Sequence, residues 1–221
     1  MGLLSDKDKA AIKERLAGMT NPVKLVNFTQ ELECQYCRET RMLMEELSEL
    51  SDLITLEKYN FLTDKEQAEK YGIDKIPATI VMDENKDYGI RYFGIPSGYE
   101  FASLLEDILM ISSGDSGLEP ESREKLATLE KPVHIQVFVT PTCPYCPMAV
   151  RLAHQIAFES DKVRGDMVEV TEFPHLGNKY GVMGVPKSIF NEKVELEGAV
   201  PEPHYVEKVL EASKISNIIT V

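Results

Sequence analysis

The sequence contains one pattern twice, at an offset of 109 residues. Cys34-Gln-Tyr-Cys37 returns as Cys143-Pro-Tyr-Cys146, and these two pairs account for all 4 cysteines of the chain. A proline follows the first cysteine of each pair by 43 residues, at Pro77 and Pro186. A spacing kept without gaps over this length constrains the chain to two copies of one structural unit.

The residues around both cysteine pairs predict the same order of strands and helices. Runs of β-branched and apolar residues precede the pairs, at Val23–Thr29 and Pro132–Phe138, and each is typical of a buried strand. Helical apolar periods follow the cysteines, and a short strand, a hairpin partner and an amphipathic helix follow each proline. The predicted order is β-α-β-α-β-β-α in each copy, with a further helix before it at Ser5–Leu16 and Pro120–Leu129.

The composition fits two folded domains. With 43% hydrophobic and 28% charged residues, the chain resembles an ordinary globular protein, and its 221 residues suffice for two cores. The small, polar run Ser112–Gly117 is typical of a turn or linker. We therefore expect one domain at 1–115 with the first cysteine pair and another at 116–221 with the second.

The charge of the chain excludes some classes of partner. Its 37 acidic and 24 basic side chains give a formal charge of -13, which repels phosphate backbones and anionic lipid headgroups. We expect neither nucleic acid nor a membrane as a partner, since no uncharged apolar stretch is long enough to span a bilayer. Charged residues soon after Met1 are unlike a signal segment, so we expect a cytoplasmic protein. Plentiful Glu and Lys with few amides suggest a heat-adapted source.

Each cysteine pair lies between a predicted strand and the start of a predicted helix. Free N–H groups and the positive partial charge of a helix N-terminus can lower a thiol pKa from about 8.5 to roughly 3.5 to 7.5. This placement makes the first cysteine of each pair a nucleophile. Pro144 stiffens the second pair where the first has Gln35, so the two sites should differ in potential. A four-thiolate zinc site, a structural disulfide in each pair and a peptide-binding module with incidental thiols are the alternatives.

The spacing of these residues resembles the thioredoxin superfamily. Tandem units with a Cys-Gln-Tyr-Cys and a Cys-Pro-Tyr-Cys centre closely resemble the protein disulfide oxidoreductases, also called glutaredoxin-like proteins, of thermophilic archaea and bacteria. This resemblance implies an α/β fold of two tandem thioredoxin-like units, each with a mixed central sheet flanked by helices. It further implies a redox-active disulfide centre in each unit and a role in cytosolic redox homeostasis. The catalytic residues would be Cys143, Cys146, Cys34 and Cys37.

The resemblance also implies an enzyme of the protein-disulfide reductase or isomerase type, acting on disulfides or thiols of protein substrates. Cys143 would be the more active nucleophile. The bonds Ile76-Pro77 and Val185-Pro186 would be cis and would pair their backbone with the substrate strand. We expect no cofactor and no metal, since no Gly-x-Gly-x-x-Gly follows a strand, so a thioredoxin-reductase-like flavoenzyme would recycle the protein.

Thioredoxin has a buried acid six residues before its first cysteine, and this chain has Phe28 and Val137 at the two matching positions. Glu57 and Glu169 are candidates for the missing proton acceptor, against the alternative of ordinary surface glutamates. The four histidines have no supporting motif and are interpreted as surface or packed residues: His134, His154, His175 and His204.

Overall fold

The computed structural model describes residues 2–215. Its first half contains α1 (Asp6–Leu16), β1 (Val23–Thr29), α2 (Cys37–Ser48), β2 (Ile54–Asn60), α3 (Lys65–Tyr71), β3 (Ala78–Met82), β4 (Ile90–Phe93) and α4 (Glu100–Ser113). Its second half contains α5 (Pro120–Ala127), β5 (Val133–Val139), α6 (Cys146–Glu159), β6 (Val163–Glu169), α7 (Pro174–Lys179), β7 (Lys187–Phe190), β8 (Val194–Glu197) and α8 (Glu202–Lys214). The order predicted from the repeat is confirmed in both halves.

Local chemistry explains where the two additional helices begin. The hydroxyl of Ser5 accepts a hydrogen bond from the backbone N–H of Asp8 at 3.2 Å, which satisfies one of the free donors of α1. Pro120 is the first residue of α5, a position where its missing N–H costs nothing. Between them, α4 ends at Gly114, which adopts the left-handed conformation with φ 75° that a side chain would disfavour. This turn leads into the linker region.

All eight strands form one sheet in the order β2-β1-β3-β4-β6-β5-β7-β8. Within each half the strand that precedes the cysteines is central, with a parallel neighbour on one side and an antiparallel neighbour on the other. The halves are joined by parallel pairing of β4 with β6, in the register Ile90↔Gly165 to Phe93↔Val168. The repeat predicted the strands of each half but not this junction.

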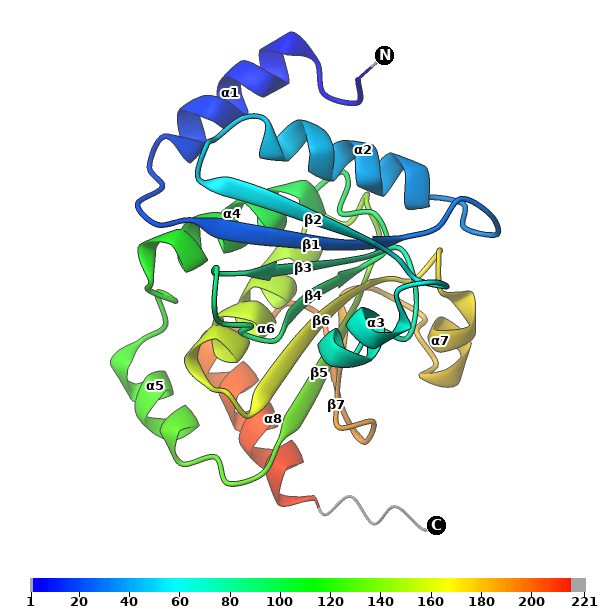
Figure 1. The fold of residues 1–221 in the computed structure, drawn as a ribbon. Coiled ribbons are helices and arrows are strands. Elements are labelled where there is room, and N and C mark those ends of the chain that lie inside the picture. Colours follow the sequence, from blue (N-terminus) through cyan, green and yellow to red (C-terminus); the bar gives the residue numbers. More distant parts are fainter. Residues whose placement is uncertain (1, 216–221) are drawn as a thin grey trace.

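The sheet buries a separate core on each of its faces, because successive residues of a strand point to opposite sides. Leu25 belongs to the core under α1, α2, α4, α5, α6 and α8, whereas Val26 and Phe28 belong to the core under α3 and α7. Figure 1 shows the short helix α3 in front of the strands and α7 to the right of them. Both helices that begin with a cysteine, α2 and α6, therefore pack on the same face. Between residues 2 and 215, no helix is both long and apolar enough to cross a membrane.

The pairing pattern places both cysteine loops on the same side of the sheet, where the carboxyl ends of β1 and β5 lie. β1 and β4 are each antiparallel to β3, and β4 is parallel to β6 and hence to β5. Because β1 and β5 run in the same direction, their carboxyl ends and the loops that follow lie at the same edge. Four strand spacings of about 4.8 Å separate β1 from β5, or roughly 19 Å across the sheet.

The packing of β6 against α6 depends on Gly165. A Cβ built at this position would lie 2.8 Å from the carbonyl oxygen of Ala153 and 3.1 Å from Cδ2 of His154. We expect Gly165→Ala to force the helix and strand apart and to lower the free energy of unfolding by about 1 to 3 kcal/mol. Urea unfolding followed by circular dichroism measures this. The control Gly18→Ala, whose new Cβ would meet its nearest atom at 3.7 Å, should cost much less, and equal losses would contradict the explanation.

Candidate active sites

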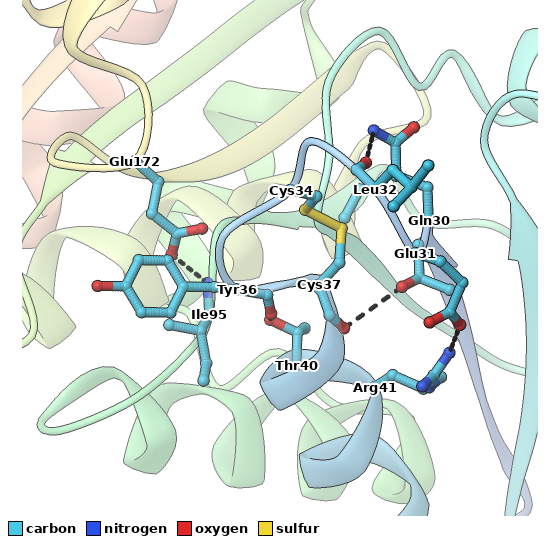
Figure 2. The surroundings of a disulfide bond; sticks show 12 residues. Gln30, Glu31, Leu32, Cys34, Tyr36, Cys37, Thr40, Arg41, Ile95 and Glu172 are labelled. Carbon is cyan, nitrogen blue, oxygen red and sulfur yellow. Dashed lines mark hydrogen bonds and ion pairs between the residues drawn. A yellow bond between two sulfur atoms is a disulfide. The ribbon is translucent and has the colours of Figure 1, made fainter.

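The first cysteine pair forms a disulfide at the start of α2 (Figure 2). The Sγ atoms of Cys34 and Cys37 are 2.01 Å apart. Cys34 lies in the loop after β1 and is partly exposed, whereas Cys37 is the first residue of the helix and is fully buried. Cys34 is therefore the sulfur that another protein can reach.

The second pair repeats this arrangement at the start of α6. Cys143 and Cys146 form a disulfide, and Cys146 is the first residue of the helix. Cys143 is 7% exposed and Cys146 is fully buried. The backbone N–H of Cys146 points at Sγ of Cys143, with an N to S distance of 3.1 Å. An N–H directed at this sulfur stabilises its thiolate form when the disulfide is open.

A cis proline follows each cysteine pair along the chain. The peptide bonds Ile76-Pro77 and Val185-Pro186 are both cis, which confirms the conformation that the family resemblance implied. The carbonyl oxygen of Val185 lies 3.7 Å from Sγ of Cys143. The loop at Val185 is thus positioned beside the sulfur of Cys143, and the contact of either proline loop with substrate stays a prediction.

A third loop completes each site at the glycine that follows the hairpin. The N–H of Gly94 donates to the carbonyl of Pro77 at 2.9 Å, and the N–H of Gly198 donates to that of Pro186 at 2.8 Å. At the second centre, the cysteine loop, the cis-proline loop and the glycine loop therefore meet, although they lie far apart in the sequence. The first half repeats the bond between its glycine loop and its cis-proline loop.

The two glutamates proposed as proton acceptors have other partners. Glu57 on β2 pairs with Lys24 at 3.1 Å and accepts a hydrogen bond from the hydroxyl of Tyr59. Glu169 is 2% exposed, and its carboxylate accepts from the N–H and hydroxyl of Thr171 and from the N–H of Glu172. Interpreting Glu169 as an ordinary surface residue was wrong, because β6 lies in the middle of the joined sheet while β2 lies at its edge.

Two glutamates that the sequence analysis missed approach the centres from the opposite half. Glu172, from the second half, accepts a hydrogen bond at 2.7 Å from the N–H of Ile95, and Figure 2 includes both residues among the surroundings of the first disulfide. Glu100 begins α4 of the first half and accepts from Ser103 at 2.9 Å. Its neighbour Tyr99 donates its N–H to the carbonyl of Pro141, just before the second cysteine pair.

Burial raises the pKa of both carboxyl groups to about 7. Glu100 is 1% exposed, and among the described residues its Oε1 has no hydrogen-bond partner. No local sequence signal identifies these acids, because their burial results from contact between the two halves.

The four histidines are packed or exposed, as interpreted from the sequence. His154 is fully buried in α6, where its Nδ1 lies 2.6 Å from Oδ2 of Asp107. His134 pairs with the buried Asp166 at 2.6 Å. His175 and His204 are exposed. The contact of His154 with Asp107 is one of several that hold α4 of the first half against α6 of the second.

Comparison with known proteins identifies the family of this chain. A family profile described as "Thioredoxin domain" matches residues 133–211 of this chain. The crystal structure of a protein disulfide oxidoreductase from Aeropyrum pernix matches with a TM-score of 0.90 and 32% identity, covering 95% of this chain and 94% of that one. The chain belongs to the protein disulfide oxidoreductase family. This confirms the resemblance noted in the sequence and the fold of tandem thioredoxin-like units.

Members and relatives of this fold differ in length. Thioredoxin of Methanocaldococcus jannaschii is 37% identical over 78 residues, which cover 35% of this chain and 92% of that protein. An alkyl hydroperoxide reductase component of Pseudomonas putida is 26% identical over 190 residues, which cover 86% of this chain and 34% of that protein. The chain thus spans about a third of the length of that larger relative.

The buried Glu100 gives stability a specific pH dependence. Its pKa is about 7 in the folded protein, against about 4.3 in an unfolded chain, so the folded state binds the proton more tightly. This stabilisation is present at pH 5 and is lost as the pH rises through 7. The parent should lose this stability as the pH rises, whereas Glu100→Gln should not. From pH 5 to pH 8, we therefore expect the unfolding free energy of Glu100→Gln to rise by about 1 to 3 kcal/mol relative to that of the parent. Urea titrations measure this, with the exposed Glu124→Gln as control; the same gain in both variants would contradict the assignment.

The surroundings of the two nucleophilic sulfurs predict different alkylation profiles in the reduced protein. The N–H of Cys146 should give Cys143 the lower midpoint pH, below about 7.5, whereas greater exposure should give Cys34 the higher plateau rate. Iodoacetamide labelling over a pH series, read by mass spectrometry of peptides, measures both quantities. Fully buried Cys37 and Cys146 serve as internal controls, and faster labelling of either would contradict the assignment.

Proposed function

We propose that this protein is an enzyme that exchanges thiols and disulfides with protein substrates through two redox centres. The observation that supports it best is the duplicated geometry: a closed disulfide at a helix start, one sulfur more accessible than the other, and a cis proline 43 residues after the first cysteine. The helix start favours the thiolate of the outer cysteine, and the buried inner cysteine is placed to attack the sulfur of the outer one once that sulfur is in a mixed disulfide with substrate. Reduction, oxidation and isomerisation of substrate disulfides all use these steps.

The exchange at the second centre begins with the dithiol form. The Cys143 thiolate attacks one sulfur of a substrate disulfide, forms a mixed disulfide and releases the other substrate sulfur as a thiolate. Cys146, once deprotonated, attacks Sγ of Cys143, which closes the Cys143–Cys146 disulfide and releases the second substrate thiolate. The reverse sequence oxidises a substrate dithiol. Cys34 and Cys37 act in the same way at the first centre.

We assign one unit of this enzyme to residues 1–115 and the other to residues 116–221. The backbone at Ile76 and Pro77, and at Val185 and Pro186, would hold the substrate strand beside the sulfurs. The position of the Val185 carbonyl, 3.7 Å from Sγ of Cys143, supports this role at the second centre. We further assign the higher activity to Cys143, supported by the N–H that points at its sulfur.

The proposed cellular setting follows from family membership and composition. We place the protein in the cytoplasm of a heat-adapted organism, where it would contribute to redox homeostasis. A thioredoxin-reductase-like flavoenzyme would return electrons to it, since the exchange itself uses cysteine sulfurs and requires no cofactor. The abundance of Glu and Lys over amide side chains supports the heat-adapted source.

Insulin reduction with dithiothreitol tests the proposed activity. We expect Cys143→Ser to lower the catalysed rate by at least about tenfold, Cys34→Ser to lower it less, and the double variant to abolish it, because each change removes a nucleophile. Cys146→Ser should accumulate a mixed disulfide with insulin, visible on a non-reducing gel. Circular dichroism confirms the fold of each variant. Full activity in the double variant would overturn the proposed function in favour of a peptide-binding module.

A further inference from the structure

The surfaces around the two redox centres can be compared position by position, because the repeat aligns them without gaps. Tyr36 and Tyr145 occupy the same position between the cysteines. Around them, polar or charged side chains of the first centre correspond to apolar residues or glycine at the second: Gln35 with Pro144, Arg38 with Pro147, Glu39 with Met148, Asp74 with Met183, and Lys75 with Gly184. The shared backbone arrangement of the two centres, which we call the frame, is the same in both. The residues compared above form the rim of each centre, and the two rims differ in polarity.

The apolar side chains of the second rim are unusually exposed. Met183 is 94% exposed, Tyr145 66% and Met148 55%. Tyr99, which is 52% exposed, joins them because its N–H bonds to the carbonyl of Pro141 before the cysteines. These four are among 7 large apolar side chains that are exposed in the described part of the chain. Single exposed apolar residues are ordinary, but a group of them marks a binding surface.

Backbone contacts and chain position connect these residues to the loops that hold the reactive sulfur of Cys143. Tyr145 lies between the two cysteines, and Met148 donates its N–H to the carbonyl of Tyr145 at 3.3 Å. Met183 is two residues before Val185, whose carbonyl oxygen lies 3.7 Å from Sγ of Cys143. A substrate sulfur that reaches Cys143 must bring its neighbouring residues across this rim.

The first rim offers a different surface. Its exposed Leu32 stands between Glu31 and Glu33, and Glu31 pairs with Arg41 at 2.5 Å (Figure 2). Lys75 pairs with Asp74 at 2.7 Å. An apolar segment placed here would remove charged groups from water without supplying them with new partners, which is unfavourable.

We infer that the second centre selects extended segments of protein substrates in which apolar side chains flank the disulfide-bonded cysteine. This inference rests on the proposed thiol–disulfide exchange and names the substrate class of one of its two centres. Methionine side chains are flexible and polarisable, so this rim accepts varied apolar sequences instead of one defined sequence. Such segments are buried in a correctly folded protein, and the second centre therefore acts on chains that are unfolded or misfolded around the cysteine. The first centre lacks this preference.

A swap of matched rim residues tests the inference. The parent is the full chain with Cys34→Ser and Cys37→Ser, which leaves the second centre alone. In the rim variant, Met148→Glu and Met183→Asp introduce the residues of the first rim. The probes are disulfide-linked dimers of two short peptides, one with leucine and phenylalanine beside the cysteine and one with glutamine and serine. Reduction with dithiothreitol as electron source is followed by chromatography.

We expect the parent to prefer the apolar peptide by roughly tenfold or more in kcat/KM, and the rim variant to lose most of that preference, chiefly through KM. Hydroxyethyl disulfide, which is too small to span the rim, should be reduced by both proteins within about twofold, which also shows that the variant is folded. In the reciprocal variant, Glu39→Met and Asp74→Met with Cys143→Ser and Cys146→Ser, the first centre should gain a preference for the apolar peptide.

Two results overturn the inference while leaving the exchange activity intact. One is equal kcat/KM of the parent for both peptides, and the other is an unchanged preference in the rim variant. A parent that fails to reduce hydroxyethyl disulfide as well as both peptides would instead overturn the proposed function at the second centre, and the inference with it. The hydroxyethyl disulfide rate thus separates the two failures.

Discussion

The parallel pairing of β4 with β6 determines how the two halves of this protein are arranged. It joins the strands of both halves into one sheet, and hydrogen bonds beside it, one from a side chain and one from the backbone, connect the two halves. Arg164 on β6 donates to the carbonyl of Gly72 in the first half at 3.0 Å, and the N–H of Gly165 donates to the carbonyl of Gly89, also at 3.0 Å. An edge strand with unpaired backbone N–H and C=O groups can pair with strands of other chains. Here β4 and β6 pair with each other, so each half covers one edge strand of the other.

The same junction packs α4 against α6 across the boundary. Asp107 on α4 accepts a hydrogen bond from the hydroxyl of Tyr92 at 2.5 Å, and its Oδ2 lies 2.6 Å from Nδ1 of His154 on α6. All three side chains are nearly or fully buried. A buried carboxylate is stable only where hydrogen bonds and nearby charge compensate for lost hydration. This contact fixes the relative position of the helix that starts at Cys146 and the helix that starts at Glu100. The surroundings of each redox centre therefore include residues of both halves.

Duplication of the frame leaves the two centres chemically distinct. Both have a disulfide at a helix start, a cis proline and a glycine loop hydrogen-bonded to that proline. These features depend on backbone geometry and tolerate different side chains around them. The rim is free of that constraint, and it is charged at Glu39 and Asp74 but apolar at Met148 and Met183. The shared frame thus supplies the cysteine geometry of both centres, whereas the inferred preference for apolar substrate segments rests on the rim.

The sequence by itself determined the duplicated order of elements, the placement of each cysteine pair at a helix start and the proline opposite it. These are properties of neighbouring residues, of hydrophobic period and of spacing, so they can be read along the chain. The tertiary structure alone decided that β4 pairs with β6, that both centres share one sheet edge, and that Glu172 bonds to Ile95, 77 residues away. Strand pairing and burial depend on contacts between distant segments, and several partners would satisfy the same local pattern. For that reason no local pattern pointed to the buried Glu100, and strand position alone suggested Glu57 and Glu169 as proton acceptors although their carboxylates are held by other groups.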